Sequence, residues 1–114
     1  MLGYREVSLP FSYLDAQARP VGYSIDLCQH VVAALKQQLQ LPNLQIKYLA
    51  VTPVSRFPLL QEGKIDLECG STSNNLERQA QVAFTVTHYV TTSRFVSKAA
   101  SKSWAASSWS WAIR

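Results

Sequence analysis

One stretch in the first half of the sequence carries apolar residues at helical spacing. The positions that share this face are Cys28, Val31, Val32, Leu35 and Leu39. Residues at these offsets fall on one side of an α-helix. We expect Ser24 or Asp26 to cap the start of this helix by accepting a backbone N–H bond. Pro42 and Asn43 are expected to end it.

Short segments of alternating or β-branched residues predict strands on both sides of this helix. The expected strands lie within residues 3–9, 44–49 and 65–69, with one or two more within 82–96. Between the first two, residues 10–20 contain polar residues and two prolines and are expected to form a turn region.

Two shorter helices are expected later in the chain. Thr52 and Pro53 suit the N-cap and first helical position of one helix, which ends at Gly63. A helix of one or two turns is expected over residues 76–81. The alternation of strands and helices predicts an α/β fold with an open, mainly parallel sheet, right-handed crossovers and flanking helices in three layers.

Composition and charge narrow the class of protein. Hydrophobic residues make up 47% of the 114 positions and charged residues 16%, as in globular domains. The net charge is +4, but the basic residues are scattered, so binding to nucleic acid is not expected. His30 and His88 lack acidic or cysteine neighbours in the pattern of a metal site, and no cofactor motif is present.

Two cysteines, Cys28 and Cys69, are far apart in the sequence and form no CxxC motif. A disulfide in an oxidising compartment and a pair of buried free thiols are both consistent with this spacing. The sequence pattern leaves the choice open.

The last part of the chain differs from the rest. Residues 97–114 are rich in Ala and Ser, show no convincing period, and contain Trp104, Trp109 and Trp111. We therefore expect a domain over residues 1–98 and an atypical tail over residues 99–114, from a truncated or misframed terminus or a poorly packed segment.

Three arginines are expected at the carboxyl ends of the predicted parallel strands, where open sheets of this kind bind ligands. They are Arg5, Arg56 and Arg78. A guanidinium group can bind a carboxylate through two hydrogen bonds. We expect Arg78 and the backbone around Ser73 to bind one carboxylate of a dicarboxylic ligand, and Arg5 and Arg56 to bind the other.

The sequence gives weaker evidence for catalysis than for ligand binding. Asp66 and Glu68 share a face of one expected strand, but each is expected to be solvated or ion-paired there. No sequence motif of a hydrolase, nucleotide-binding or zinc-protease site is present.

The chain also resembles a known family. Residues 3–6 (GYRE), 10–13 (PFSY) and 21–27 (VGYSIDL) resemble the opening of family 3 solute-binding proteins. Residues 65–79 (IDLECGSTSNNLERQ) resemble the glutamate/aspartate branch of that family. The resemblance runs from about Leu2 to Lys98.

This resemblance implies a periplasmic, monomeric receptor with two lobes that binds glutamate or aspartate and delivers it to the permease of an ABC transporter. It implies that Arg78 binds the α-carboxylate with help from Ser71 and Ser73. It also implies that Arg5 and Arg56 face the side-chain carboxylate.

The chain departs from the family pattern at Pro53, where the branch often has Ser, and in the tail after Lys98. Family members are also about twice as long or more, so we expect this chain to be an incomplete first lobe with weak glutamate binding alone. The alternatives are an enzyme on the same fold of the cyclohexadienyl dehydratase type, a sensory ligand-binding module, and an inert fragment.

Overall fold

The computed structural model describes residues 1–92 of the chain. The end of the strand expected within 82–96, the boundary expected at residue 98 and the tryptophan-rich tail lie outside the described residues.

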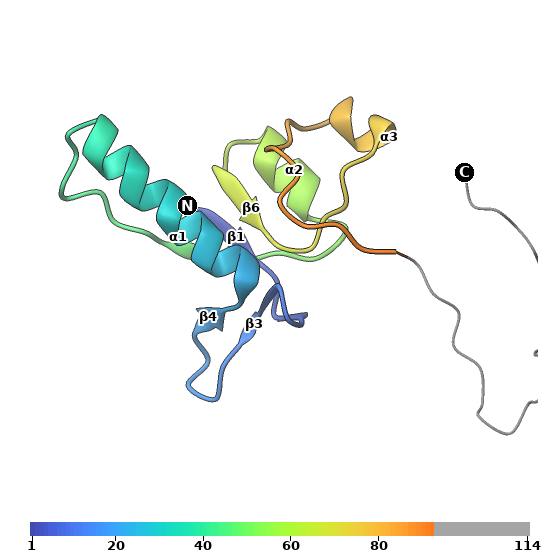
Figure 1. Cartoon of the computed structure of the whole chain (residues 1–114), viewed down its shortest axis with the longest axis horizontal. Coiled ribbons are helices and arrows are strands. Elements are labelled where there is room, and N and C mark those ends of the chain that lie inside the picture. Colours follow the sequence, from blue (N-terminus) through green and yellow to red (C-terminus); the bar gives the residue numbers. More distant parts are fainter. Residues whose placement is uncertain (93–114) are drawn as a thin grey trace, which may run out of the picture.

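A three-stranded parallel sheet forms the centre of the fold (Figure 1). β1 (Leu2–Tyr4) lies in the middle, between β5 (Tyr48–Ala50) and β6 (Leu67–Cys69). Leu2 of β1 is paired with Tyr48 on one side and with Leu67 on the other. The predicted parallel α/β sheet is therefore confirmed, although β5 lies later than the strand expected at residues 44–49.

A second, antiparallel sheet follows β1 and was not expected. It consists of β2 (Val7–Ser8), β3 (Ser12–Leu14) and β4 (Pro20–Val21) in that order. The strand expected over residues 3–9 is thus two strands in two different sheets. The turn between β3 and β4 is held by Asp15, whose carboxylate accepts hydrogen bonds from the backbone N–H groups of Gln17 and Arg19.

The longest helix is α1 (Tyr23–Gln38), and its capping was predicted wrongly. Gly22 is the N-cap residue, and no side chain caps the helix. The N–H groups of Tyr23 and Ser24 instead donate to the backbone carbonyls of Pro10 and Phe11, at 3.1 and 2.8 Å. Because these donors are already satisfied, no capping hydroxyl or carboxylate is needed.

Helix α2 (Arg56–Gln61) begins later than Pro53, where it was expected. Thr52 and Ser55 form a turn before it, since the N–H group of each donates to the hydroxyl of the other. This turn places Arg56, instead of Pro53, in the first position of the helix.

The third helix, α3 (Leu76–Gln79), is one turn long. The side chain of Asn75 caps it by accepting a hydrogen bond from the N–H group of Arg78 at 2.9 Å. Residues 82–92 contain neither helix nor strand, so the strand prediction is wrong for this part. Val, Thr and aromatic residues favour strands only where a neighbouring strand offers a partner, and none pairs with this segment among the described residues.

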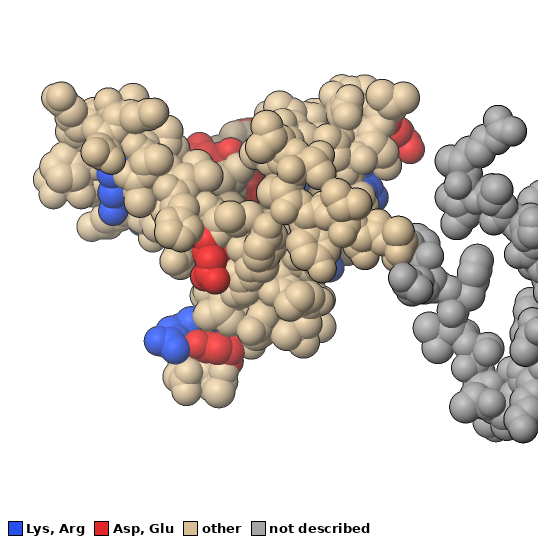
Figure 2. Space-filling model, viewed as in Figure 1, with Lys and Arg blue, Asp and Glu red and all other residues tan. Residues whose placement is uncertain are grey.

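The charged side chains are spread over the surface. On the face shown in Figure 2, Lys and Arg are separated by uncharged surface and form no continuous basic patch. None of the helices within residues 1–92 is long and apolar enough to cross a membrane.

Successive side chains of β1 point to opposite faces of the parallel sheet, and a different helix covers each face. Leu2 is buried against α1, and Tyr4 packs on the same cluster. Gly3 faces the other way, where a Cβ atom would lie 2.6 Å from Ile65 and 3.2 Å from Val51. The segment around Ile65 follows α2, so α1 and α2 cover opposite faces of the parallel sheet (Figure 1).

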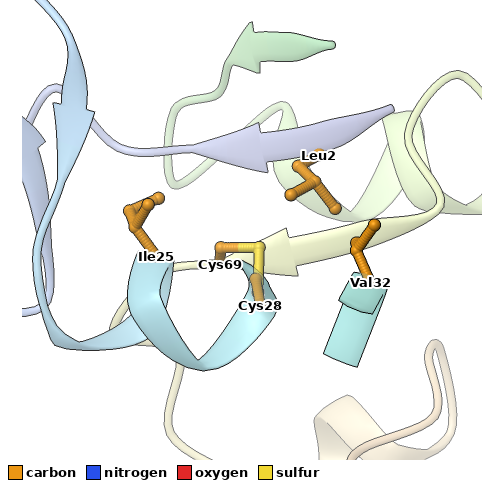
Figure 3. Packing of buried hydrophobic residues seen from close by; sticks show 5 residues of the cluster. All are labelled: Leu2, Ile25, Cys28, Val32 and Cys69. Carbon is orange, nitrogen blue, oxygen red and sulfur yellow. A yellow bond between two sulfur atoms is a disulfide. The ribbon is translucent and has the colours of Figure 1, made fainter. Parts of the chain in front are cut away.

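The core between α1 and the sheet is small (Figure 3). Its buried members are Leu2, Ile25, Cys28, Val32 and Cys69. Cys28 and Cys69 form a disulfide with a Cα–Cα distance of 6.3 Å, which resolves the choice that the sequence left open.

Only part of the predicted apolar face of α1 is buried. Cys28 and Val32 lie in the core, whereas Val31, Leu35 and Leu39 are 44, 40 and 59% exposed. The predicted helix is confirmed, but part of its apolar face is left uncovered within residues 1–92, because the sheet covers only one edge of the helix.

Candidate functional site

Arg5 follows directly on β1 and its backbone is fixed by a buried serine. Its N–H group donates to the hydroxyl of Ser12 at 2.9 Å, and this hydroxyl donates to the carbonyl of Arg5 at 3.1 Å. Ser12 is completely buried. The two bonds hold Arg5 at the junction between the parallel and the antiparallel sheet, as expected for a residue at the carboxyl end of β1.

Arg56 opens α2 and is only 8% exposed. Its guanidinium carbon lies 5.1 Å from the ring centre of Phe57, which is within the range of a cation–π interaction. Its Nε atom is buried and has no hydrogen-bond partner. A cation held this way is available to bind an anion.

The charges around Arg56 show that the three predicted arginines come together. Burial lowers the pKa of Arg56, and the positive charges of Arg78 and Arg5 lower it further. Glu68 acts in the opposite direction and is the strongest of the neighbouring charges. Arg5 and Arg78, from distant parts of the sequence, therefore both lie close enough to Arg56 for their charges to act on it.

The turn after β6 joins Arg78 to the predicted serines. One terminal nitrogen of Arg78 donates to the carbonyl of Ser73 at 2.9 Å and lies 3.1 Å from its hydroxyl. The hydroxyl of Ser71 is 2.6 Å from that of Ser8 in β2. Ser73 is thus held by Arg78, whereas Ser71 ties the turn to the antiparallel sheet.

Two links from α1 fix the start of this turn. Cys69 is held by the disulfide to Cys28. The carbonyl of Gly70 accepts a hydrogen bond from the hydroxyl of Ser24 at 2.7 Å. The two residues that precede Ser71 are therefore anchored to α1.

Glu68 belongs to the site, although the sequence assigned it to solvent or an ordinary ion pair. Burial raises the pKa of its carboxyl, and Thr72, Arg56 and Arg5 oppose this shift in that order. Asp66, which was expected on the same face, is exposed and pairs with the N-terminal amine instead. The alternation of β6 was the signal for Glu68, since it places this side chain opposite the cysteine of the core.

A hollow of about 380 Å³ lies beside the turn. It is lined by residues 70–74, by Phe11 and by residues 84–91, so Ser71 and Ser73 contribute to its wall. None of the three arginines lines it. Ser73 connects the two regions, because it lines the hollow and accepts a hydrogen bond from Arg78.

The aromatic side chains of Phe11 and Tyr89 line this hollow, and the sequence did not point to them. The rings of Phe11 and Tyr89 meet edge to face with centres 4.9 Å apart. Tyr23 contacts both rings and donates its hydroxyl to the carbonyl of His88 at 3.0 Å. These contacts hold the 84–91 segment against α1 without strand pairing.

Within residues 1–92, no group of three or more His, Cys, Asp or Glu side chains is placed to hold a metal ion. What the site offers is a set of guanidinium groups, hydroxyls and backbone groups. Such groups bind and orient an anion.

Comparison with known proteins gives the family. Residues 1–109 match the bacterial extracellular solute-binding proteins, family 3. The chain belongs to this family. The resemblance seen in residues 3–27 and 65–79 is thereby confirmed.

Among the family 3 proteins, the glutamate/aspartate import solute-binding protein of Salmonella typhimurium is 50% identical over 98 residues, which cover 86% of this chain and 32% of that protein. The protein of the same description from Escherichia coli K12 is 49% identical with the same coverage. The L-glutamate/L-aspartate-binding protein of Pseudomonas aeruginosa is 50% identical and is covered to 32%. The chain therefore spans about a third of the length of these relatives.

Solved structures of solute-binding proteins share the fold. An ancestral arginine-binding protein bound to arginine superposes with a TM-score of 0.63 at 26% identity, covering 74% of this chain and 34% of that one. The solute receptor for L-cysteine of Neisseria gonorrhoeae gives 0.61 at 23% identity, covering 73% and 32%. At this level of identity the second match supports the fold alone.

Proposed function

We propose that this chain provides one wall of an acidic-amino-acid site in an extracytoplasmic receptor for glutamate or aspartate, which delivers its ligand to an ABC transporter permease. The observation that supports this proposal is that Arg5 and Arg78 both act on the buried Arg56, with the carboxyl of Glu68 beside Arg56 and Arg5. The names of the relatives at about 50% identity support the same ligand class.

The charges of the site match such a ligand. The three guanidinium groups carry three positive charges, and the neighbouring carboxyl group is that of Glu68. Glutamate and aspartate carry two carboxylates, whereas a neutral amino acid carries one. A dicarboxylate can bind guanidinium groups with both of its ends, whereas a neutral amino acid offers them one carboxylate.

Each carboxylate has proposed partners. Arg78, already bonded to Ser73, would bind the α-carboxylate beside the hydroxyl of Ser71. Arg5 and Arg56 would bind the side-chain carboxylate. Charge-assisted hydrogen bonds of this kind contribute about 1.5–3 kcal/mol each when shielded from water. Pro53 has no hydroxyl, so this position contributes no side-chain hydrogen bond.

The proposal includes no catalytic step, since the polar groups of the site are suited to holding an anion. It places the chain in the periplasm, where a disulfide such as Cys28–Cys69 persists. It also expects weak binding by this chain by itself, because one wall leaves the ionic contacts open to water and salt.

The test is a titration of the ¹⁵N-labelled chain followed by NMR. L-Glutamate and L-aspartate are expected to shift the backbone amides of residues 70–78, and L-glutamine at the same concentration is not. Arg78→Gln should abolish the shifts. Arg19→Gln, an exposed arginine paired with Asp15 far from the site in the fold, is the matched control and should retain them.

Equal shifts with glutamine and glutamate would overturn the assignment to acidic amino acids. Calorimetry that gives a micromolar dissociation constant would contradict the expectation of weak binding by the chain alone, while leaving the ligand class in place.

A further inference from the structure

The carboxylate of Glu68 occupies a confined place next to Gly70. A Cβ atom at position 70 would lie 2.2 Å from Oε1 of Glu68 and 3.1 Å from Cγ of Arg5. The side chains of Glu68 and Arg5 therefore both pack against the backbone of residue 70, where only glycine leaves room for them. The negative charge of Glu68 is held beside the stem of Arg5 by packing.

Unpaired buried atoms gather in the same region. Among the described residues, the buried side-chain nitrogen and oxygen atoms without a hydrogen bond of ordinary geometry are Arg56 Nε, Glu68 Oε1 and Thr72 Oγ1, although the Thr72 hydroxyl lies near enough to the Glu68 carboxyl to lower its pKa. They include a cationic donor, an anionic acceptor and a hydroxyl. Leaving such atoms unpaired costs free energy, so their presence in a native fold calls for a functional explanation.

The electrostatic relation between Glu68 and the arginines is mutual. The charge of Glu68 raises the pKa of Arg56, and the charges of Arg56 and Arg5 lower the pKa of Glu68. The positive charge of Arg78 lowers the pKa of Arg56. Without Glu68, the positive charges of Arg5 and Arg56 would act on each other with no counter-charge beside them.

On the basis of the proposed function, we propose that Glu68 is a positioning residue of the ligand site. Its carboxylate opposes the mutual repulsion of Arg5 and Arg56 and keeps both guanidinium groups in place for the side-chain carboxylate of the ligand. Preorganisation of this kind lowers the cost of binding. Glu68 itself does not contact the ligand in this proposal.

The first test needs no ligand. The carboxyl carbon of Glu68 is titrated by ¹³C NMR in the wild-type chain, in Arg56→Gln and in Arg19→Gln. Loss of the neighbouring positive charge in Arg56→Gln is expected to raise the Glu68 pKa. Arg19→Gln, which removes a charge in the β3–β4 turn, should leave it unchanged. An unchanged pKa in Arg56→Gln would overturn the positioning role.

The second test measures ligand affinity in Glu68→Gln, which keeps the shape of the side chain and removes the charge. Glutamate is expected to bind about tenfold more weakly, because two guanidinium groups lose the charge that keeps them in place. Glu62→Gln makes the same change at an exposed carboxylate paired with Lys64 and should bind as the wild type does. Circular dichroism checks that both variants fold.

The outcomes separate the two proposals. Unchanged or tighter glutamate binding in Glu68→Gln overturns the positioning role while the proposed function stands. Failure of the wild-type chain to discriminate glutamate from glutamine overturns the proposed function, even where the first test shows the Glu68–Arg56 coupling.

Discussion

The hydroxyl of Ser24 donates a 2.7 Å hydrogen bond to the carbonyl of Gly70, across 46 residues of sequence. One helical turn further along α1, Cys28 is bonded to Cys69. Cys69, at the end of β6, and Gly70, at the start of the following turn, are thus attached to two successive turns of α1. This arrangement explains how a short sheet with a small core holds Ser71 and Ser73 in a defined place.

Ser24→Ala should lower the free energy of unfolding by about 1–3 kcal/mol. Ser24 is buried, and the variant leaves the carbonyl of Gly70 without its partner. Urea denaturation followed by circular dichroism measures the change. Gln37→Ala, at an exposed position of the same helix, should change stability by less than about 0.5 kcal/mol. Equal stability of Ser24→Ala and the wild type would contradict the role of this bond.

Replacing both Cys28 and Cys69 by Ala should destabilise the chain by about 3–4 kcal/mol. The bond closes a loop between residues 41 positions apart, and a loop of that size restricts the unfolded chain by about this amount. The comparison is made by urea denaturation of the oxidised wild type and the double variant. Two alkylatable thiols in the folded, oxidised protein, detected by mass spectrometry, would be incompatible with the structure.

Gly70→Ala should disturb the site more than the fold. The added methyl group would collide with Oε1 of Glu68 and crowd Cγ of Arg5. Crowding of a packed site costs about 1–3 kcal/mol, and here it would displace the two side chains in question. NMR should show shifted signals for Glu68 and Arg5. Gly63→Ala, where a Cβ atom meets nothing within 4 Å but φ is +69°, should lower stability without moving those signals.

Glu68 should make the chain less stable as the pH rises. Burial places its folded-state pKa above the ordinary value of 4.5, so the folded state binds this proton more tightly than the unfolded state does. The contribution to stability is therefore fully present below 4.5 and is lost as the pH rises through the raised pKa.

Asp15 acts in the opposite direction, because hydrogen bonds from the backbone and side chain of Arg19 lower its pKa. The informative quantity is thus the difference in unfolding free energy between the wild type and Glu68→Gln across this pH range. A difference that does not change with pH would contradict the raised pKa.

Sequence patterns predicted the parallel sheet and the existence of the helices, but not several boundaries. The period of α1 was clear, yet its start depends on the carbonyls of Pro10 and Phe11, which lie close only after folding. Residues 82–92 have the composition of a strand, but a strand needs a partner that no local pattern reveals. Half of the α1 face stayed exposed for the same reason, since burial depends on what the rest of the chain covers.

The proximity of Arg5 and Arg78 to Arg56 could be predicted because the carboxyl ends of parallel strands meet at one edge of a sheet. Glu68 was missed because alternation shows which face a side chain lies on but not how deeply it is buried. The ring of Phe11 was missed because it reaches the site through the unexpected antiparallel sheet, in which β3 follows it directly. The positions of Glu68 and Phe11 both depend on tertiary contacts, which the local sequence pattern does not show.

The guanidinium Nε–H signals of Arg5, Arg56 and Arg78 provide the most direct test of the site. In a ¹H–¹⁵N NMR titration with L-glutamate, these three signals are expected to shift together with one apparent dissociation constant, while the signal of Arg19 stays in place. Shifts of the three signals with different dissociation constants, or no shift at all, would contradict a single site built from three arginines.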